Sequence, residues 1–254
     1  MEMGREAGKL VAVLSPAKRM AAVSLFGRAM TRPVFEADAA HLAEELKSCP
    51  AWRLEPLLGV NPELAVQAFC AYQEFDRAAE FPALLSYRGL AYRYVEAETL
   101  SREDWDFAQE HLRLFSALYG LLRPLDGIHP YRLELQCRFR PDGRTLYAYW
   151  GNRVWEELYR ERPIVINLAS EEYSRLVSRY RRPEQEWITC EFRTFRRGKL
   201  VTLPALAKMA RGRMARAIIR NRWERPGQLA AFDEDGYRFR PELSDTARMV
   251  FVQE

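Results

Sequence analysis

Residues 164–173, IVINLASEEY, decide the fold of this chain. The run IVINL has the apolar pattern of a strand buried on both faces, as in a parallel sheet covered by helices, and ASEEY leads from it into a helix. The run KLVAVL at residues 9–14 is a second short strand of this kind. It ends at Ser15-Pro16, because proline biases the residue before it away from helix. Buried strands followed by loops and helices favour an α/β fold.

The composition is that of a soluble globular protein. The chain has 254 residues, enough for a sizeable core, with 48% hydrophobic and 29% charged residues. No apolar run approaches the roughly 18 residues that a membrane-spanning helix needs. The apolar piece LVAVL is also too short for the core of a signal peptide. We therefore expect a cytoplasmic protein with no membrane partner.

The sequence carries no recognisable metal-binding or disulfide pattern. The cysteines lie far apart, no C-x-x-C pair occurs, and the chain has three histidines. This favours reduced, buried thiols over a zinc site, and we expect no metal and no cofactor. The cysteines are Cys49, Cys70, Cys137 and Cys190.

The remaining elements follow from periodicity and turn residues. Helical spacing predicts a helix over 37–46, a helix pair joined by a turn at 59–61, and one helix over 101–118 that begins with a capping box at Ser101 and Asp104. The triplet Leu58-Gly59-Val60 is similar to the turn of helix-hairpin-helix modules, although a plain helical hairpin fits it better. Alternation predicts a β-hairpin over 187–203, and a basic helix and a final strand follow. We expect one compact mixed α/β domain over residues 1–254.

Residues 114–136, LFSALYGLLRPLDGIHPYRLELQ, are predicted to be a helix end, a tight turn and the start of a strand. They form one of four stretches in which polar residues follow apolar elements. Because strand ends meet at one edge of an open sheet, we expect Lys18 and Asn167 to lie near each other. The candidates for general acid or base are Lys18, Glu134, Glu171 and Lys208. The candidates for ligand or DNA binding are Arg123, Tyr131, Arg132, Asn167, Ser170, Tyr173, Arg211, Arg213 and Arg216.

Structural roles compete with these assignments. Arg123 with Asp126, or Arg132 with Glu134, can form a salt bridge that fixes a turn. Asn167, Ser170 and Glu171 can cap the helix that follows. From Lys208 to Arg222 there are six basic residues and no acidic one, which predicts an anion or a partner close to this helix. No P-loop, G-x-S-x-G, H-E-x-x-H or G-x-G-x-x-G motif is present.

The chain resembles the YaaA family of peroxide stress proteins, from about residue 10 to residue 251. The resemblance rests on ordered motifs: VLSPAKRM, DFAQEHLRLFSALYGLLRPLDGIHPYRLE, LYAYWGNRVWEEL, INLASEEYSRLV, AKMARGRMARAIIRNR and LAAFDEDGYRF. It implies a single domain of unusual topology, with a mixed sheet flanked by helices, and a cytoplasmic role in limiting peroxide damage. It also implies DNA binding by a helix-hairpin-helix-like element beside a positively charged cleft.

The resemblance places most of the candidate residues in that cleft and the hairpin at residues 119–121, after a helix ending at Leu118. This chain departs from the family pattern at Leu90, Ala117 and Gln136, where an acidic residue, glycine and glycine are usual. Two hypotheses follow. One is a DNA-binding stress protein with mostly phosphate contacts and little sequence preference. The other is a divergent paralogue acting as an enzyme on a nucleotide, nucleobase or other small anionic substrate in a specialised biosynthetic pathway.

A third, weaker hypothesis is iron handling, which the stress role suggests. Carboxylates are available as hard ligands, but no spacing of His, Cys and Glu indicates a metal site. The oligomeric state is left open by the sequence.

Overall fold

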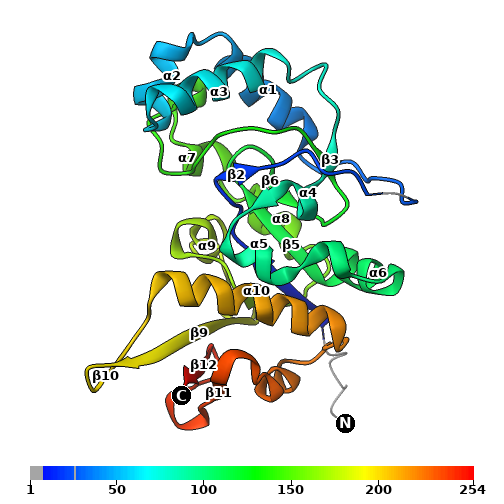
Figure 1. Ribbon diagram of the computed structural model, residues 1–254, viewed down its shortest axis with the longest axis vertical. Helices are drawn as coiled ribbons and strands as arrows, with labels where there is room; N and C mark the ends of the chain where they lie inside the picture. Colours follow the sequence, from blue (N-terminus) through cyan, green and yellow to red (C-terminus); the bar gives the residue numbers. More distant parts are fainter. Residues whose placement is uncertain (1–7, 26) are drawn as a thin grey trace.

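The centre of the molecule is a mixed sheet with the strand order β11-β12-β9-β8-β1-β5-β6, in which β10 also pairs with β9 (Figure 1). The computed structural model describes residues 8–25 and 27–254. The five strands from β12 to β5 are parallel to one another, and β11, β10 and β6 are antiparallel to their neighbours. The strands are β1 (Leu10–Leu14), β5 (Leu112–Ser116), β6 (Gly120–Leu122), β8 (Ile164–Asn167), β9 (Trp187–Arg196), β10 (Lys199–Val201), β11 (Tyr237–Phe239) and β12 (Arg248–Gln253).

Helices cover this sheet and extend beyond one end of it, where α1, α2 and α3 form a layer of their own (Figure 1). Two further pairs of short strands, β2 with β4 and β3 with β7, lie outside the main sheet. The α-helices are α1 (Glu36–Lys47), α2 (Ala51–Leu58), α3 (Pro62–Gln73), α4 (Ala83–Ser86), α5 (Leu90–Val95), α6 (Arg102–His111), α7 (Leu146–Trp150), α8 (Arg153–Leu158), α9 (Glu171–Ser178) and α10 (Pro204–Arg220). The short strands are β2 (Arg19–Met20), β3 (Phe81–Pro82), β4 (Tyr87–Arg88) and β7 (Gly127–Ile128).

Five 3-10 helices are found in the described part of the chain: η1 (Ala97–Thr99), η2 (Pro141–Gly143), η3 (Pro226–Ala231), η4 (Glu234–Gly236) and η5 (Pro241–Leu243). None of the described helices is both long enough and apolar enough to cross a membrane.

The α/β class and the mixed sheet predicted from the sequence are confirmed. Both apolar runs form buried central strands, since every residue of β1 and of β8 is buried. The β9–β10 hairpin turns at Arg197 and Gly198, as predicted. The helices α2 and α3 are a plain helical hairpin, whose turn is made by Gly59 at a φ of 65°. The cysteines are free, but Cys70 is exposed rather than buried.

The prediction of one helix over residues 101–118 is wrong in its second half. The capping box at Ser101 is confirmed, but α6 ends at His111 and residues 112–116 form β5. The apolar positions Leu112 and Phe115 continue the helical spacing of α6, so the boundary is not visible in the pattern. Pairing with β1, where Ala12 lies opposite Leu112, overrides that local preference.

The helix-hairpin-helix element placed at residues 118–121 is therefore wrong as well. The segment joins β5 to β6 as a β-hairpin, with Phe115 opposite Leu121 and Gly120 at a φ of 66°. A side chain at Gly120 would meet the ring of Trp150 at 2.9 Å. Close packing against α7 therefore explains this glycine.

Candidate functional site

A cavity of about 390 Å³ opens beside the carboxyl ends of β1 and β8. The loop after β1, the start of α5, residues 131–134, the loop into α9 and one face of α10 line it. The lining residues are Ser15, Pro16, Ala17, Lys18, Arg19, Arg88, Gly89, Leu90, Ala91, Tyr92, Tyr131, Arg132, Leu133, Glu134, Leu168, Ser170, Glu172, Tyr173, Lys208 and Arg211. Adjacent parallel strands place their carboxyl ends at one edge, which is a common ligand site in open sheets.

Hydroxyl groups tie the two strand ends together. The Ser170 backbone N–H donates a hydrogen bond to Ser15 Oγ at 2.8 Å, and the two Oγ atoms lie 3.1 Å apart. The Tyr92 hydroxyl donates to the Ser15 carbonyl at 2.9 Å. These bonds connect the loop after β1 to both α5 and the start of α9. The edge of the cavity is thereby fixed by three different elements.

Glu134 joins two basic side chains at the cavity. Its Oε2 lies 2.6 Å from Lys18 Nζ, and its Oε1 accepts a hydrogen bond from Arg132 Nη2 at 2.7 Å. Arg132 Nη1 also donates to the Lys18 carbonyl at 3.1 Å. The pairing of Arg132 with Glu134 that was expected from the sequence is therefore present, but it forms part of the cavity wall. Both basic groups are held in place by one carboxylate.

Glu172 supplies a second carboxyl group with different properties. Burial raises its pKa, and the nearby Glu134 carboxylate raises it further, while backbone N–H groups of Gln136 and Leu135 counteract this. Its Oε1 is buried and accepts no hydrogen bond from any described residue. A carboxyl group whose pKa is shifted toward neutrality can gain or release a proton during a reaction.

The face of α10 contributes Lys208 and Arg211. Within residues 8–25 and 27–254, neither has an ion pair with an acidic side chain. Burial lowers the pKa of the Arg211 guanidinium, and its Nε is buried without a hydrogen-bond partner. A buried charge is normally stabilised by an ion pair and by hydrogen bonds, and Arg211 has no ion pair and an unsatisfied Nε. Arg19, an exposed residue of the short strand β2, also has no acidic partner in the described structure.

Tyr131 lines the cavity, but its hydroxyl group forms hydrogen bonds with buried residues. The hydroxyl lies 2.8 Å from both Tyr87 Oη and Ser116 Oγ. Burial raises the pKa of Tyr131 to about 12, so the phenol stays protonated at neutral pH. Its position beside Arg132 fixes the segment that carries Glu134.

The structure brings eight of the predicted site residues to the cavity: Lys18, Tyr131, Arg132, Glu134, Ser170, Tyr173, Lys208 and Arg211. Arg123 is elsewhere, because it donates to Asp126 and fixes the turn before β7. Asn167 is buried, where its side chain accepts from the Ala169 N–H and donates to Thr189. Arg123 thus has the structural role that competed with binding, whereas Asn167 is held in the interior and does not cap α9, whose N-cap residue Ser170 makes no side-chain cap hydrogen bond. Glu171 is exposed and does not line the cavity.

The remaining basic residues of the α10 region are paired within the chain. Arg213 contacts Glu234 and Asp235, both at 3.5 Å, and Arg216 lies 3.2 Å from Glu96. Arg220 and Arg222 both form ion pairs with Asp104, at 2.9 and 2.7 Å. The acidic partners missing from the local sequence are therefore supplied by other elements. An external anion is not needed to offset the charge of these four arginines.

Sequence reasoning missed Glu172, Arg19 and Arg88, which line the cavity. Glu172 follows Glu171 directly, and the phase of α9 decides which of the two faces inward: Glu171 is exposed, whereas Glu172 is partly buried. Arg88 lies outside the four polar stretches from which the candidate residues come. In the structure it forms an ion pair with Glu98 at 2.6 Å.

The chain is similar to known proteins over nearly its whole length. The model of a family described as peroxide stress protein YaaA matches residues 10–243. A UPF0246 protein of Clostridioides difficile is 35% identical over 248 residues, covering 96% of this chain and 100% of that protein. A UPF0246 protein of Bacteroides fragilis is 40% identical over 253 residues, covering 96% and 98%.

Proposed function

Since the chain belongs to the family of peroxide stress protein YaaA, we propose that it acts under peroxide stress by binding a small anionic ligand in the cavity between β1, β8 and α10. The ligand class is a nucleotide or a related molecule with an anionic end and an apolar body. The cavity volume of about 390 Å³ lies within the range of small-molecule sites.

One observation carries this proposal: Lys208 and Arg211 line the cavity with no acidic partner among the described residues. Keeping a guanidinium partly buried and unpaired costs free energy, which an anion would recover through charge-assisted hydrogen bonds. The neighbouring arginines of α10 do not have this property, because each is paired with a carboxylate. Within α10, the basic side chains that lack an acidic partner in the described structure are thus the two that line the cavity.

The other walls suit the rest of such a ligand. Leu90, Tyr92, Leu133, Leu168 and Tyr173 offer apolar and aromatic surface in the parts of the wall that do not come from α10. Glu172, with its raised pKa, could exchange a proton with a bound molecule. The cavity would then serve an enzyme acting on a small anionic substrate.

A second candidate function is binding of DNA through its phosphates. The observation that favours it is the exposure of Lys18 and Arg19 at the rim of the cavity, where 68% of the Lys18 side chain is accessible. Contacts of this kind would weaken steeply with salt and show little sequence preference. Arg213 and Arg216 contribute less to this function than the sequence suggests, because both are paired with carboxylates.

The two functions are separated by measuring ligand binding to the intact protein. We expect adenosine monophosphate or guanosine monophosphate to raise the melting temperature, with a weaker effect of adenine or guanine alone. Arg211→Met should weaken nucleotide binding about tenfold or more, the loss of one charge-assisted hydrogen bond. The same variant should unfold at a higher temperature without ligand, because it removes an unpaired buried charge.

Arg213→Met is the matched control. It removes an arginine two residues beyond Arg211 that does not line the cavity, contacts Glu234 and lies 4.4 Å over the Tyr94 ring. We expect it to lower stability slightly and leave nucleotide binding unchanged. The small-ligand proposal fails if no nucleotide binds or if Arg211→Met binds as tightly as the natural protein. Salt-sensitive binding of short duplex DNA that is weakened by Arg19→Met would favour the second function.

A further inference from the structure

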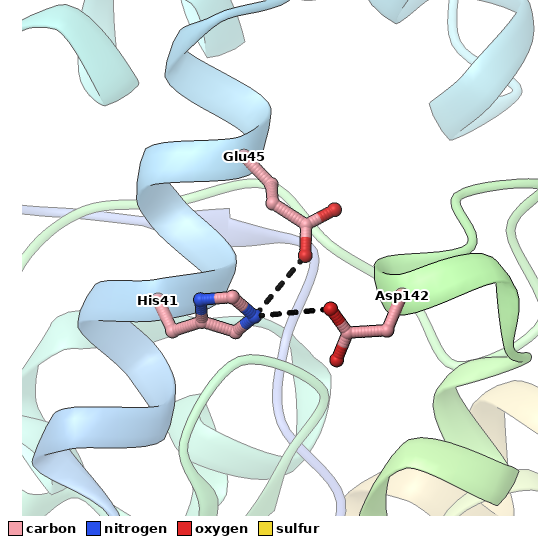
Figure 2. A group of neighbouring side chains, drawn as sticks. All are labelled: His41, Glu45 and Asp142. Carbon is pink, nitrogen blue, oxygen red and sulfur yellow. Dashed lines mark ion pairs between the residues drawn. The ribbon is translucent and has the colours of Figure 1, made fainter.

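Three side chains of metal-ligating type meet at a surface distant from the cavity walls, between α1 and the segment before α7 (Figure 2). His41 Nε2 lies 3.2 Å from Glu45 Oε1 and 3.6 Å from Asp142 Oδ1. The three potential ligand atoms all lie within 4.8 Å of one another. None of these residues lines the cavity described above.

Two local features of the chain produce this arrangement. His41 and Glu45 are four residues apart on α1, so their side chains project from the same face of the helix. Asp142 lies in the 3-10 turn Pro141–Gly143 at a φ of 48°, a left-handed conformation that aspartate tolerates better than most residues. Arg144 Nη2 donates to Asp142 Oδ2 at 3.1 Å. That bond occupies one carboxylate oxygen while the other faces His41.

The spacing suits a shared ion. Ligand atoms about 2.1 Å from an ion, at tetrahedral or octahedral angles, lie roughly 3.0–3.5 Å apart. The distances from His41 Nε2 to the two carboxylates are close to this range. Glu45 Oε1 is shielded from solvent, and its contact with His41 Nε2 does not have the geometry of a hydrogen bond. A cation at the centre of the group would satisfy that oxygen.

We propose that His41, Glu45 and Asp142 bind a divalent transition-metal ion. One imidazole with two carboxylates is a borderline ligand set, suited to ions such as Zn²⁺, Mn²⁺, Fe²⁺ or Co²⁺ and poorly suited to Mg²⁺, which prefers oxygen ligands alone. The side chains of His41 and Asp142 are each 49% exposed, so further coordination positions are open to water or to a small molecule. Arg144 acts as a positioning residue by orienting Asp142.

The competing explanation is an ion-pair cluster in which a protonated His41 contacts both carboxylates with no metal. Direct titration of the metal-free full-length protein with Co²⁺, followed by visible absorption and by calorimetry, distinguishes the two. We expect about one Co²⁺ per chain, with d–d bands typical of nitrogen and oxygen ligands. Exposed Cys70 is a possible competing ligand, and a sulfur-to-metal band in the near ultraviolet would identify binding there.

The variants assign the site. His41→Ala and Asp142→Asn should each weaken Co²⁺ binding about tenfold or more, and Arg144→Ala should weaken it less or equally, as for an outer-shell partner. His129→Gln is the matched control, since His129 Nε2 lies 3.6 Å from a single carboxylate, that of Glu80, and it should leave binding unchanged. Melting curves in metal-free buffer show whether each variant is folded. Absence of Co²⁺ binding, or binding that His41→Ala leaves unchanged, overturns the proposal.

Discussion

The buried carboxylate of Asp104 caps one helix and also pairs with two arginines of the basic segment. Its side chain is 5% exposed and accepts hydrogen bonds from the Ser101 N–H, Arg220 and Arg222. It therefore completes the capping box of α6 and joins that helix to the end of α10. Two positive charges of the basic segment are satisfied by this one residue, so they do not require a partner outside the chain.

The stability contributed by Asp104 should depend on pH. Burial alone would raise its pKa, but the Ser101 N–H and the two guanidinium groups outweigh burial and lower the pKa from 3.8 to about 2. Because the pKa is lower in the folded protein than in the unfolded chain, the stabilisation is complete above about pH 4 and is lost as the pH falls toward 2. We expect Asp104→Asn to lower the free energy of unfolding by about 2 kcal/mol at pH 7. Urea unfolding at several pH values would measure this.

The difference between the natural protein and Asp104→Asn should shrink between pH 4 and pH 2. Asp106→Asn is a suitable control, because Asp106 belongs to the same helix and pairs with Arg28, yet its side chain is 65% exposed. Solvent screening makes such a pair weak, so little change is expected. An equal loss of stability at pH 2 and pH 7 in Asp104→Asn would contradict the assignment.

At the scale of elements, the packing of α10 against α5 sets the width of the cavity. Lys208 and Arg211 come from α10, whereas Leu90 and Tyr92 come from α5. The two helices touch at Gly212, where a Cβ atom would lie 2.0 Å from the Ala91 carbonyl oxygen. No side chain fits there unless the helices separate.

Gly212→Ala should therefore destabilise the protein, although alanine in place of glycine normally favours a helix. We expect a loss of about 1–3 kcal/mol in the free energy of unfolding, as for other overpacked sites, together with weaker nucleotide binding. Urea unfolding and calorimetry would measure the two effects. Gly227→Ala is the control, because nothing lies within 4 Å of the added Cβ and its cost should be small. Equal stability of the two variants would show that the contact at Ala91 relaxes easily.

The elements differ in how far the sequence predicts them. The strands β1 and β8 are predictable because a short, wholly buried strand leaves a continuous apolar run. The end of α6 cannot be predicted in this way, because Leu112 and Phe115 continue the helical spacing. They become strand residues only by pairing with β1 and β6. Long-range pairing of this kind leaves no local signal.

The sequence does not show which of the candidate residues come together in the folded protein, and this limits the prediction of the site. Lys18 is predictable because it follows a recognisable strand, Lys208 because it belongs to a basic helix, and Glu134 because it lies in the polar stretch 114–136; all three line the cavity. Arg123 lies in the same polar stretch and Asn167 ends a buried strand, yet their partners hold them elsewhere. Which polar residue meets which partner depends on the whole fold. The same holds for Asp142, which reaches His41 from a distant part of the chain.

At the scale of the whole molecule, one buried cluster connects the α1–α3 layer with the sheet. Trp150 is central to this connection: it packs edge-on against Phe35, before α1, at 5.3 Å and donates a hydrogen bond to the Ala117 carbonyl after β5 at 2.9 Å. At the other end of the sheet, Phe251 of β12 packs against Phe192 and Phe232. Apolar contact is therefore continuous from α1 to β12.

This continuity predicts a single cooperative unfolding transition for the part of the chain that the structure describes. Leu42→Ala in α1 and Phe251→Ala in β12 remove fully buried side chains at opposite ends of the cluster. Each should lower the free energy of unfolding by about 2–5 kcal/mol and shift the same transition, seen alike by calorimetry, circular dichroism and tryptophan fluorescence. If each variant instead shifted a separate transition, the α1–α3 layer would be an independent folding unit. The contact of Trp150 with Phe35 and Ala117 would then be an interface between two units, and the cavity, which is lined by the second unit, would survive the melting of the first.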